Sequence, residues 1–202
     1  MSYLYERVQL DEASLQRIKA NVENRPVAML TAFRGRDADG NPMDRKTNRG
    51  NNARLESDIR AAGFGFNKLI GTYDEDDGKG GKRRVEEESF LIIGRDDAAA
   101  TVGAIKGFAK KMGQKYGQDC VLFKDPKNKN AVLIGTKPDA WPGLGKEESV
   151  GEFKPMAMSG IYSKMVRGKQ AAPRGFKFEA IEYPLTPTEI MARKLRDRLA
   201  QQ

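Results

Sequence analysis

The sequence predicts an α+β protein in which one antiparallel sheet carries helices on one face. Up to residue 135 the segments follow the order strand, helix, strand, strand, helix, strand, which is the split βαβ pattern of ferredoxin-like folds. The helical segments have a single apolar stripe each, so they need one sheet face to cover. With 202 residues, the chain is long enough for one core. We expect an α+β core domain over residues 1–135, an irregular basic extension over 136–186 and a C-terminal helix over 187–202.

The first segments are a helix and a strand. Residues 10–24 repeat Leu15, Ile18 and Val22 at helical spacing, which predicts a short helix. Pro26 interrupts it, and the compact apolar run that follows over 27–33 predicts a buried strand.

A long polar segment separates this strand from the next helix. Residues 34–48 are rich in Asp, Gly, Asn and Pro and predict a loop. The spacing of Leu55 and Ile59 predicts a helix over about 51–62, and Gly63 stands where a left-handed residue ends many helices. Alternating residues over 66–73 and an apolar run over 89–94 then predict a hairpin.

The second half of the core repeats this scheme. Residues 96–112 place five residues on one helical stripe, namely Ala98, Val102, Ile105, Ala109 and Met112. Residues 118–123 and 131–135 read as another hairpin around the turn at 125–128. One more strand is thereby added to the ferredoxin-like pattern.

The pattern becomes irregular after Gly135. Proline and glycine recur from 138 to 145, and we expect a short helix over 159–166 and a strand over 176–183. Two further prolines precede the last helix, whose narrow apolar stripe lies beside four cations. That helix is expected to dock on its own domain or on a second copy, so homo-oligomerisation is possible.

The composition excludes several chemistries. The chain has no histidine and one cysteine, Cys120. It therefore has no histidine general base, no Ser-His-Asp or Cys-His nucleophile, no intrachain disulfide and no zinc site of the usual Cys/His kind. Cys120 lies in an apolar run, which favours a small buried side chain over a reactive thiol. We expect no cofactor.

Charge and hydropathy bear on partners and location. No apolar run reaches the roughly 18 residues of a membrane span, and the first residues lack the order of a signal peptide. We therefore expect a soluble protein of a cytoplasm. The net charge of +8 and the pI near 9.5 favour nucleic acid or an acidic protein surface as partner.

Polar residues gather at the start of the helix over 51–62. A helix N-terminus attracts anions, and asparagine and arginine side chains bond phosphates. Ordinary capping by Asn48 or Asn51, with local ion pairs, explains the same residues. Aromatic and cationic residues alternate later in the chain, where ring stacking and a simple strand pattern are both open readings. The candidate nucleic-acid contacts are Arg45, Lys46, Asn48, Arg49, Asn52, Arg54, Lys164, Arg167, Lys169 and Arg174.

Acidic residues suggest another chemistry. The triplet Glu86-Glu87-Glu88 with Asp74 to Asp77 could supply carboxylates for magnesium. These acids flank a hairpin tip and alternate with cations, so a solvated, self-compensating loop is the stronger reading. We therefore expect no metal site and no assigned catalytic residue.

Short motifs in residues 27–135 resemble a family of small uncharacterised proteins encoded by tailed phages and mobile elements. The motifs are Asn48-Arg49, Leu55, Gly63-Phe64-Gly65, Gly71-Thr72-Tyr73, Glu87-Glu88-Ser89-Phe90 and Gly117-Gln118-Asp119. The resemblance implies a phage or mobile-element origin, and hence work in the cytoplasm of an infected host or in a virion. It carries no catalytic assignment.

The sequence thus favours a non-enzymatic, basic, phage-encoded accessory protein that binds single-stranded or duplex nucleic acid or a nucleic-acid-handling complex. The alternative is a virion component or an inhibitor that docks on a host protein. A third hypothesis is a metal-dependent nuclease or phosphodiesterase that uses Glu75, Glu87, Glu88 or Asp119.

Overall fold

The structure, a computed structural model, describes residues 16–37, 39–76, 82–156, 162–167 and 170–178. Its first helical segment, residues 16–24, leads through Pro26 into β1 (Val27–Leu30). The remaining elements of the first half are α2 (Arg45–Ala61), β2 (Gly65–Asp76) and β3 (Lys82–Ile93). The second half has α3 (Ala99–Lys115), β4 (Cys120–Lys124), β5 (Asn130–Gly135), β6 (Glu147–Met156), β7 (Tyr162–Arg167) and β8 (Gln170–Phe178).

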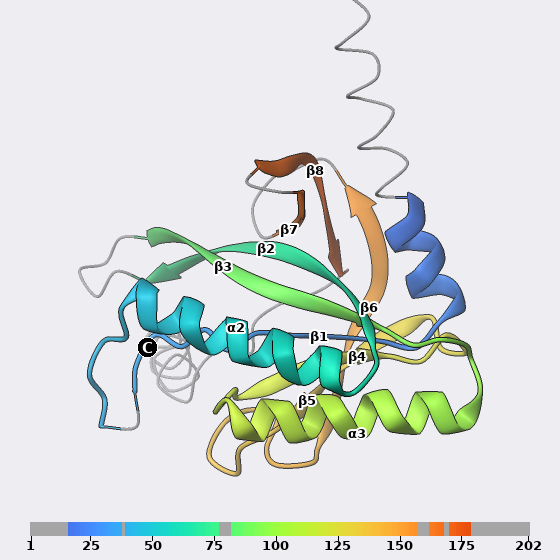
Figure 1. Ribbon diagram of the computed structural model, residues 1–202, viewed down its shortest axis with the longest axis horizontal. Coiled ribbons are helices and arrows are strands. Elements are labelled where there is room, and N and C mark those ends of the chain that lie inside the picture. The colour runs from blue at the N-terminus through green and yellow to red at the C-terminus, as the bar shows by residue number, and fades with distance from the viewer. Residues whose placement is uncertain (1–15, 38, 77–81, 157–161, 168–169, 179–202) are drawn as a thin grey trace, which may run out of the picture.

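The α+β class and the ferredoxin-like pattern are confirmed. β1 pairs with both β3 and β4, and β3 pairs with β2, all antiparallel. The strand order β4-β1-β3-β2, with α2 and α3 as the crossovers, is the split βαβ arrangement. Both helices lie on one side of these strands (Figure 1).

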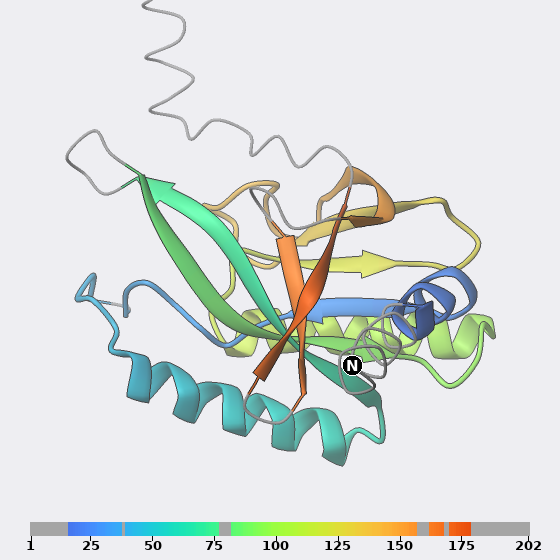
Figure 2. The same ribbon diagram turned by 90° about the horizontal axis from the view of Figure 1, so that it is seen from above.

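The later strands continue this sheet into a closed barrel. β5 pairs with β4, β6 with β5, β8 with β6 and β7 with both β8 and β2. The full order is β1-β3-β2-β7-β8-β6-β5-β4, and Figure 2 shows β7 and β8 crossing over the sheet from the side opposite α2 and α3. The short helix expected over 159–166 is wrong, because Tyr162–Arg167 forms β7. The helix expected over 187–202 lies outside the described residues.

Alternation along the strands divides the apolar residues into two cores. Phe90 and Ile92 of β3 pack with Leu55, Ile59 and Ile105 of the helices. The intervening Leu91 and Ile93 pack with residues of the barrel interior and with the helix over 16–24. Successive strand residues point to opposite faces, so one strand serves both cores.

Helix α2 begins six residues earlier than the sequence predicted. Asp44 is the N-cap, and its carboxylate accepts hydrogen bonds from the Thr47 backbone N–H at 2.8 Å and from the Thr47 hydroxyl at 2.6 Å. These bonds lower the pKa of Asp44, the Thr47 hydroxyl first. Residues 45–48, which the sequence predicted to be the end of a loop, therefore belong to the first turn of α2.

The C-terminus of α2 is as predicted. Gly63 has φ +73°, and its N–H donates to Arg60 O while the Phe64 N–H donates to Ile59 O. These two bonds form a Schellman motif. Helix α3 ends in the same way at Gly117, which has φ +65°, and this turn brings the chain to the site described next.

No helix in the described part of the chain is long and apolar enough to cross a membrane.

Candidate functional site

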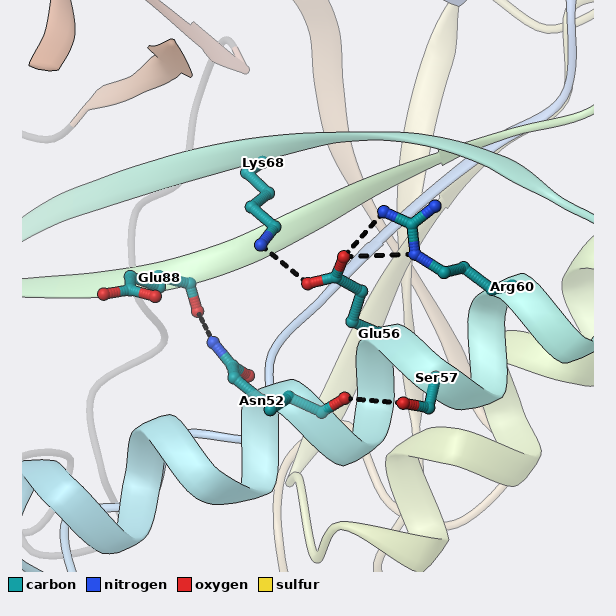
Figure 3. A network of polar contacts seen from close by, with 7 residues as sticks. Asn52, Glu56, Ser57, Arg60, Lys68 and Glu88 are labelled. Atoms are coloured by element: carbon teal, nitrogen blue, oxygen red, sulfur yellow. Dashed lines mark hydrogen bonds and ion pairs between the residues drawn. The ribbon is translucent and has the colours of Figure 1, made fainter. Parts of the chain in front are cut away.

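Asn52 of α2 fastens the helix to the end of β1 and to β3. Its side chain is 2% exposed. The Oδ1 atom accepts from the Ala32 backbone N–H at 2.7 Å. The Nδ2 atom donates to the Glu88 carbonyl at 2.7 Å (Figure 3). The Thr31 hydroxyl donates to the same Glu88 carbonyl at 2.7 Å. One amide side chain thereby fixes two strands at one end of the barrel.

Asn48, one turn earlier, fixes the segment that follows. Its Oδ1 accepts from the Arg34 backbone N–H and its Nδ2 donates to the Arg34 carbonyl, both at 2.9 Å. This bidentate pairing replaces the sheet partners that Arg34 lacks beyond β1. The backbone from which the Arg34 side chain extends is therefore held by a buried asparagine.

The charged side chains of α2 are mostly paired with neighbours. The Glu56 carboxylate accepts from Lys68 Nζ at 2.6 Å and from Arg60 Nη2 at 2.7 Å (Figure 3). The hydrogen bond from Lys68 is the main reason that the pKa of Glu56 lies below its usual value. Arg49 Nε lies 3.4 Å from Glu88 Oε1. These cations are compensated locally and do not form an uninterrupted positive surface.

Strand alternation separates the two described acids of the glutamate triplet. Glu88 is two residues from Phe90 on β3, so it points to the same face of the sheet. It faces α2, where it pairs with Arg49. Glu87 is four residues from Leu91 and so points to the same face as Leu91, which is the barrel interior. Glu87 therefore belongs to the open end of the barrel, opposite Gly71 of β2 in the register.

A pocket of about 470 Å³ lies at this end of the barrel. We call it the mouth pocket, and it collects two acids and three cations from segments far apart in sequence. Its lining residues are Phe33, Arg34, Gly35, Arg36, Glu87, Gly117, Gln118, Asp119, Cys120 and Lys137. Both signs of charge therefore stand within one concave site of the size that small ligands occupy.

Two contacts order the mouth pocket. Lys137 Nζ lies 2.7 Å from Asp119 Oδ1, and Gln118 Nε2 donates to the Phe33 carbonyl at 2.9 Å. Cys120 is half-buried, and burial together with the Asp119 charge raises its pKa to about 11. The thiol is thus protonated at neutral pH and is no nucleophile there.

A larger groove of about 770 Å³ adjoins the mouth pocket between α2 and α3. We call it the α2–α3 groove, and it shares Arg34 and Gly117 with the mouth pocket. Its other lining residues are Asp37, Met43, Asn51, Arg54, Ser57, Asp58, Gln114, Lys115 and Tyr116. A Cβ at Gly117 would stand 2.9 Å from Arg34 Nη1, so the glycine makes room for the guanidinium between the two cavities.

The groove contains an ordered polar cluster. Asp58 Oδ2 accepts from Lys115 Nζ at 2.6 Å and from the Tyr116 hydroxyl at 2.7 Å. Burial raises the pKa of Asp58, but these two hydrogen bonds outweigh it and leave the pKa below its usual value. The same burial, together with Asp58, raises the pKa of Tyr116, so the phenol stays protonated.

Within the described residues, no three acids or cysteines stand close enough together to hold a metal ion.

The structure places the predicted nucleic-acid contact residues in different environments. Asn48 and Asn52 are buried structural anchors. Arg45 and Lys46 are exposed in the first turn of α2, Arg49 pairs with Glu88, and Arg54 lines the α2–α3 groove, its Nη1 lying 3.4 Å from Asn51 Oδ1. The backbone of Lys164 and Arg167 lies on β7 and that of Arg174 on β8. Lys169 lies outside the described residues.

Sequence reasoning missed most of the mouth pocket. Arg34, Arg36 and Lys137 follow strands that end at the same edge, which only the topology reveals. Two pointers were present in the sequence. The motif Gly117-Gln118-Asp119 was noted without a role, and strict alternation backwards from Leu91 would have separated Glu87 from Glu88.

Comparison with known proteins identifies the family. The family model described as the S-Adenosylmethionine lyase family matches residues 29–171, and the chain belongs to this family. A comparison with curated proteins found no match. The expectation of a non-enzymatic accessory protein that binds DNA or other nucleic acid is therefore wrong, because the family is one of enzymes. The virion component, the docking inhibitor and the metal-dependent nuclease do not fit the family either.

Proposed function

We propose that this protein is a lyase that cleaves S-adenosylmethionine at a carbon–sulfur bond of its sulfonium centre. The observation that carries the proposal is the family match over residues 29–171. That range contains every residue that lines the mouth pocket and the α2–α3 groove. We assign the reaction to the mouth pocket.

The charges of the mouth pocket suit this substrate. S-adenosylmethionine carries a sulfonium, an α-ammonium and a carboxylate on one short chain. Glu87 and Asp119 supply negative charge for the first two groups, and Arg34, Arg36 and Lys137 supply positive charge for the third. A site whose charged side chains all had the same sign would attract only the oppositely charged groups of this substrate.

The reaction needs no histidine. A lyase breaks the bond without water, and the substrate contains its own nucleophile. In the step that we propose, a carboxylate oxygen of the substrate forms a bond to its γ-carbon, and the γ-carbon–sulfur bond breaks. The electron pair goes to sulfur, so the products are 5′-methylthioadenosine and homoserine lactone, and no proton is transferred. The lack of histidine and the protonated Cys120 are compatible with this chemistry.

The task of the protein in this step is to hold one conformation. The carboxylate must lie in line with the γ-carbon–sulfur bond, and orientation of this kind is worth about 7–11 kcal/mol in favourable intramolecular cases. We assign Glu87 to the ammonium and sulfonium end of the substrate, since it is the described acid of the triplet on the barrel-interior face. Asp119, paired with Lys137, completes the charged wall.

The proposal also gives the protein a location. S-adenosylmethionine is an intracellular metabolite, so the activity belongs in a cytoplasm.

The test is the conversion of S-adenosylmethionine by purified protein, followed by chromatography of the adenosyl product. Glu87→Gln removes the charge on the interior face, and we expect a fall in turnover of about 100-fold or more. Glu88→Gln is the matched control on the other face of the same strand, and its turnover should stay within about 3-fold of the parent. Equal losses in both variants, or no 5′-methylthioadenosine from the parent, would contradict the assignment.

A further inference from the structure

The α2–α3 groove carries more positive than negative charge. Three cations and two acids line it, namely Arg34, Arg54, Lys115, Asp37 and Asp58. Lys115 Nζ lies 2.6 Å from Asp58 Oδ2, so these two charges compensate each other. The charges that remain are the guanidinium groups of Arg34 and Arg54 and the carboxylate of Asp37.

The carboxylate of Asp37 is engaged within its own loop. Its Oδ1 accepts from the backbone N–H groups of Asp39 at 2.9 Å and Asn41 at 2.8 Å, and its Oδ2 accepts from Asn41 Nδ2 at 3.2 Å. The hydrogen bond from the Asn41 backbone is the main reason that the pKa of Asp37 lies below its usual value, and the charge of Arg34 is a minor one. Asp37 therefore reduces the field of Arg34 without occupying its donors.

The two guanidinium groups keep donors for a ligand. The ion pairs among the described residues involve neither Arg34 nor Arg54. Arg54 Nη1 donates a long hydrogen bond of 3.4 Å to Asn51 Oδ1. The Arg34 guanidinium lies against Gly117, where a Cβ would stand 2.9 Å from Nη1 and 3.1 Å from Cζ. Since each guanidinium has five N–H donors, most of them are available at both arginines.

We infer that the α2–α3 groove is a second ligand site, which binds the phosphate group of a small molecule through Arg34 and Arg54. Guanidinium groups bind phosphate oxygens through paired, charge-assisted hydrogen bonds. Two of them match a phosphate monoester, which carries about two negative charges at neutral pH. The groove volume of about 770 Å³ lies within the range of about 300–1,000 Å³ that is usual for small-molecule sites, so an organic body fits beside the phosphate.

Arg34 couples this site to the mouth pocket, because it lines both cavities. The coupling rests on the proposed function, in which Arg34 attracts the carboxylate of S-adenosylmethionine. A phosphate bound to Arg34 offsets the positive charge that this carboxylate needs. The groove ligand and the substrate therefore compete, and the groove ligand is an inhibitor of the proposed reaction.

Titration calorimetry on the full chain tests the binding, with inorganic phosphate and glycerol 3-phosphate as ligands. Sodium chloride at the same ionic strength is the reference, since salt screens exposed charges without a specific site. Equal affinities for the two ligands indicate free phosphate as the natural ligand, and tighter binding of glycerol 3-phosphate indicates a monoester. A parent protein that binds neither ligand beyond the sodium chloride reference would overturn the inference.

Two variants test the position of the site. Arg54→Gln removes a guanidinium at an exposed position of the groove, and we expect it to weaken phosphate binding by about 10-fold or more, the value of a charged hydrogen bond. Arg45→Gln makes the same change in charge at an exposed position of α2 outside the groove, and its affinity should stay within about 3-fold of the parent. Folding of both is checked by circular dichroism. Equal losses in the two variants would overturn the site.

Steady-state kinetics test the coupling. At a phosphate concentration of about ten times its dissociation constant, we expect KM for S-adenosylmethionine to rise about 10-fold with kcat unchanged, as competition requires. The same phosphate concentration should raise the KM of Arg54→Gln by about 2-fold, because its phosphate site is then half-occupied. A fall in kcat at constant KM would contradict the role given to Arg34.

Failure of this inference is distinguishable from failure of the proposed function, because phosphate binding is measured without turnover. If the parent cleaves S-adenosylmethionine but does not bind phosphate, the lyase stands and the groove site falls. If the parent shows no cleavage but Arg54→Gln loses the phosphate affinity that Arg45→Gln keeps, the groove site stands and the lyase falls.

Discussion

The two ends of the barrel are built from different kinds of residue. At the end where β1 begins, the helix over 16–24 buries Ile18 and Val22 against the interior. Lys124 is buried beside them and donates from Nζ to the Val22 carbonyl at 2.9 Å. At the end where β1 stops, the strands give way to the charged mouth pocket. One end is closed by apolar packing, and the other is left open and polar.

This difference assigns stability and chemistry to separate places. Apolar area removed from water stabilises the closed end at about 25 cal/mol per Å². The open end carries charged groups that packing alone would not keep in place, so hydrogen bonds from Asn48 and Asn52 hold its backbone. A variant at the closed end should therefore change stability and leave turnover nearly intact, and a variant at the open end should do the reverse. Asn52 is the exception, because it affects both properties.

The largest effect is expected at Asn52. Asn52→Ala leaves the buried Ala32 N–H without its partner and removes the bond to the Glu88 carbonyl. An unsatisfied buried group costs about 1–3 kcal/mol, so we expect a loss of about 3 kcal/mol in the free energy of unfolding, measured by urea denaturation. Lyase turnover should also fall in the molecules that remain folded. The reason is that β3 carries both the Glu88 carbonyl, to which Asn52 is bonded, and Glu87, which lines the mouth pocket.

Asn51→Ala is the control for this change. Asn51 stands next to Asn52 on α2, is half-buried, and accepts a long hydrogen bond of 3.4 Å from Arg54 Nη1. The free energy of unfolding of Asn51→Ala should differ from that of the parent by less than about 0.5 kcal/mol. A similar loss in both variants would show that the anchor role given to Asn52 is mistaken.

A pair of substitutions sharpens the contrast between the ends. Val22→Ala removes two buried methyl groups at the closed end and should cost about 2 kcal/mol of stability, with turnover of the folded enzyme unchanged. Arg34→Ala at the open end should cost less than about 1 kcal/mol but lower turnover at least 10-fold. Thermal denaturation and steady-state kinetics on both proteins measure the two properties. Loss of activity in Val22→Ala at temperatures where it is fully folded would break the contrast.

Lys124 gives the closed end a dependence on pH. Burial lowers its pKa against the opposing effects of Asp125, Glu23 and Glu152. Between this lowered pKa and the unfolded value of about 10.4, the unfolded chain binds more protons, so stability rises with pH. Lys124→Met lacks this contribution. We expect the parent to gain stability relative to Lys124→Met as pH rises toward 10.4, in denaturation curves at several pH values. A relative loss would mean that the carboxylates dominate and that the pKa is raised.

The smallest effect concerns Cys120 in the mouth pocket. With a pKa raised to about 11, only about 0.1% of this thiol is ionised at pH 8, whereas an ordinary thiol of pKa near 8.5 is about one quarter ionised. Labelling of the native protein by a maleimide at pH 8 should therefore be at least 100-fold slower than labelling in urea. Turnover of Cys120→Ser should stay within about 3-fold of the parent, and a much larger loss would give the thiol a role in the reaction.

Local patterns in the sequence were enough for the order of the core elements. The stripe of Ile105, Ala109 and Met112 gave α3, and Gly63 gave the end of α2. The start of α2 was misplaced because Asp44 caps it with Thr47, and arginine and asparagine in the first turns look like a loop. The strand β7 was missed, and β8 was expected only from residue 176 onward, because strand pairing with β2 and β6 decides their structure, and that pairing is not local.

The candidate site was harder to predict for the same reason. Asn48 and Asn52 were read as ligand contacts, since a sequence does not show that their partners are the backbone of Arg34, Ala32 and Glu88. The net charge of +8 suggested a polyanion, but two of the α2 cations, Arg49 and Arg60, are paired with carboxylates in space. A zwitterionic pocket contributes almost nothing to net charge and so left no trace in the composition.

The central claim is that S-adenosylmethionine is cleaved by its own carboxylate and not by water. Turnover in ¹⁸O-labelled water, followed by mass spectrometry of the four-carbon product and its fragments, tests it directly. The account predicts homoserine lactone whose γ-oxygen is unlabelled, with any label acquired on later ring opening confined to the carboxyl group. Label in a γ-hydroxyl would show direct hydrolysis, and an oxygen-free γ-carbon would show elimination. Either result would contradict the proposed reaction.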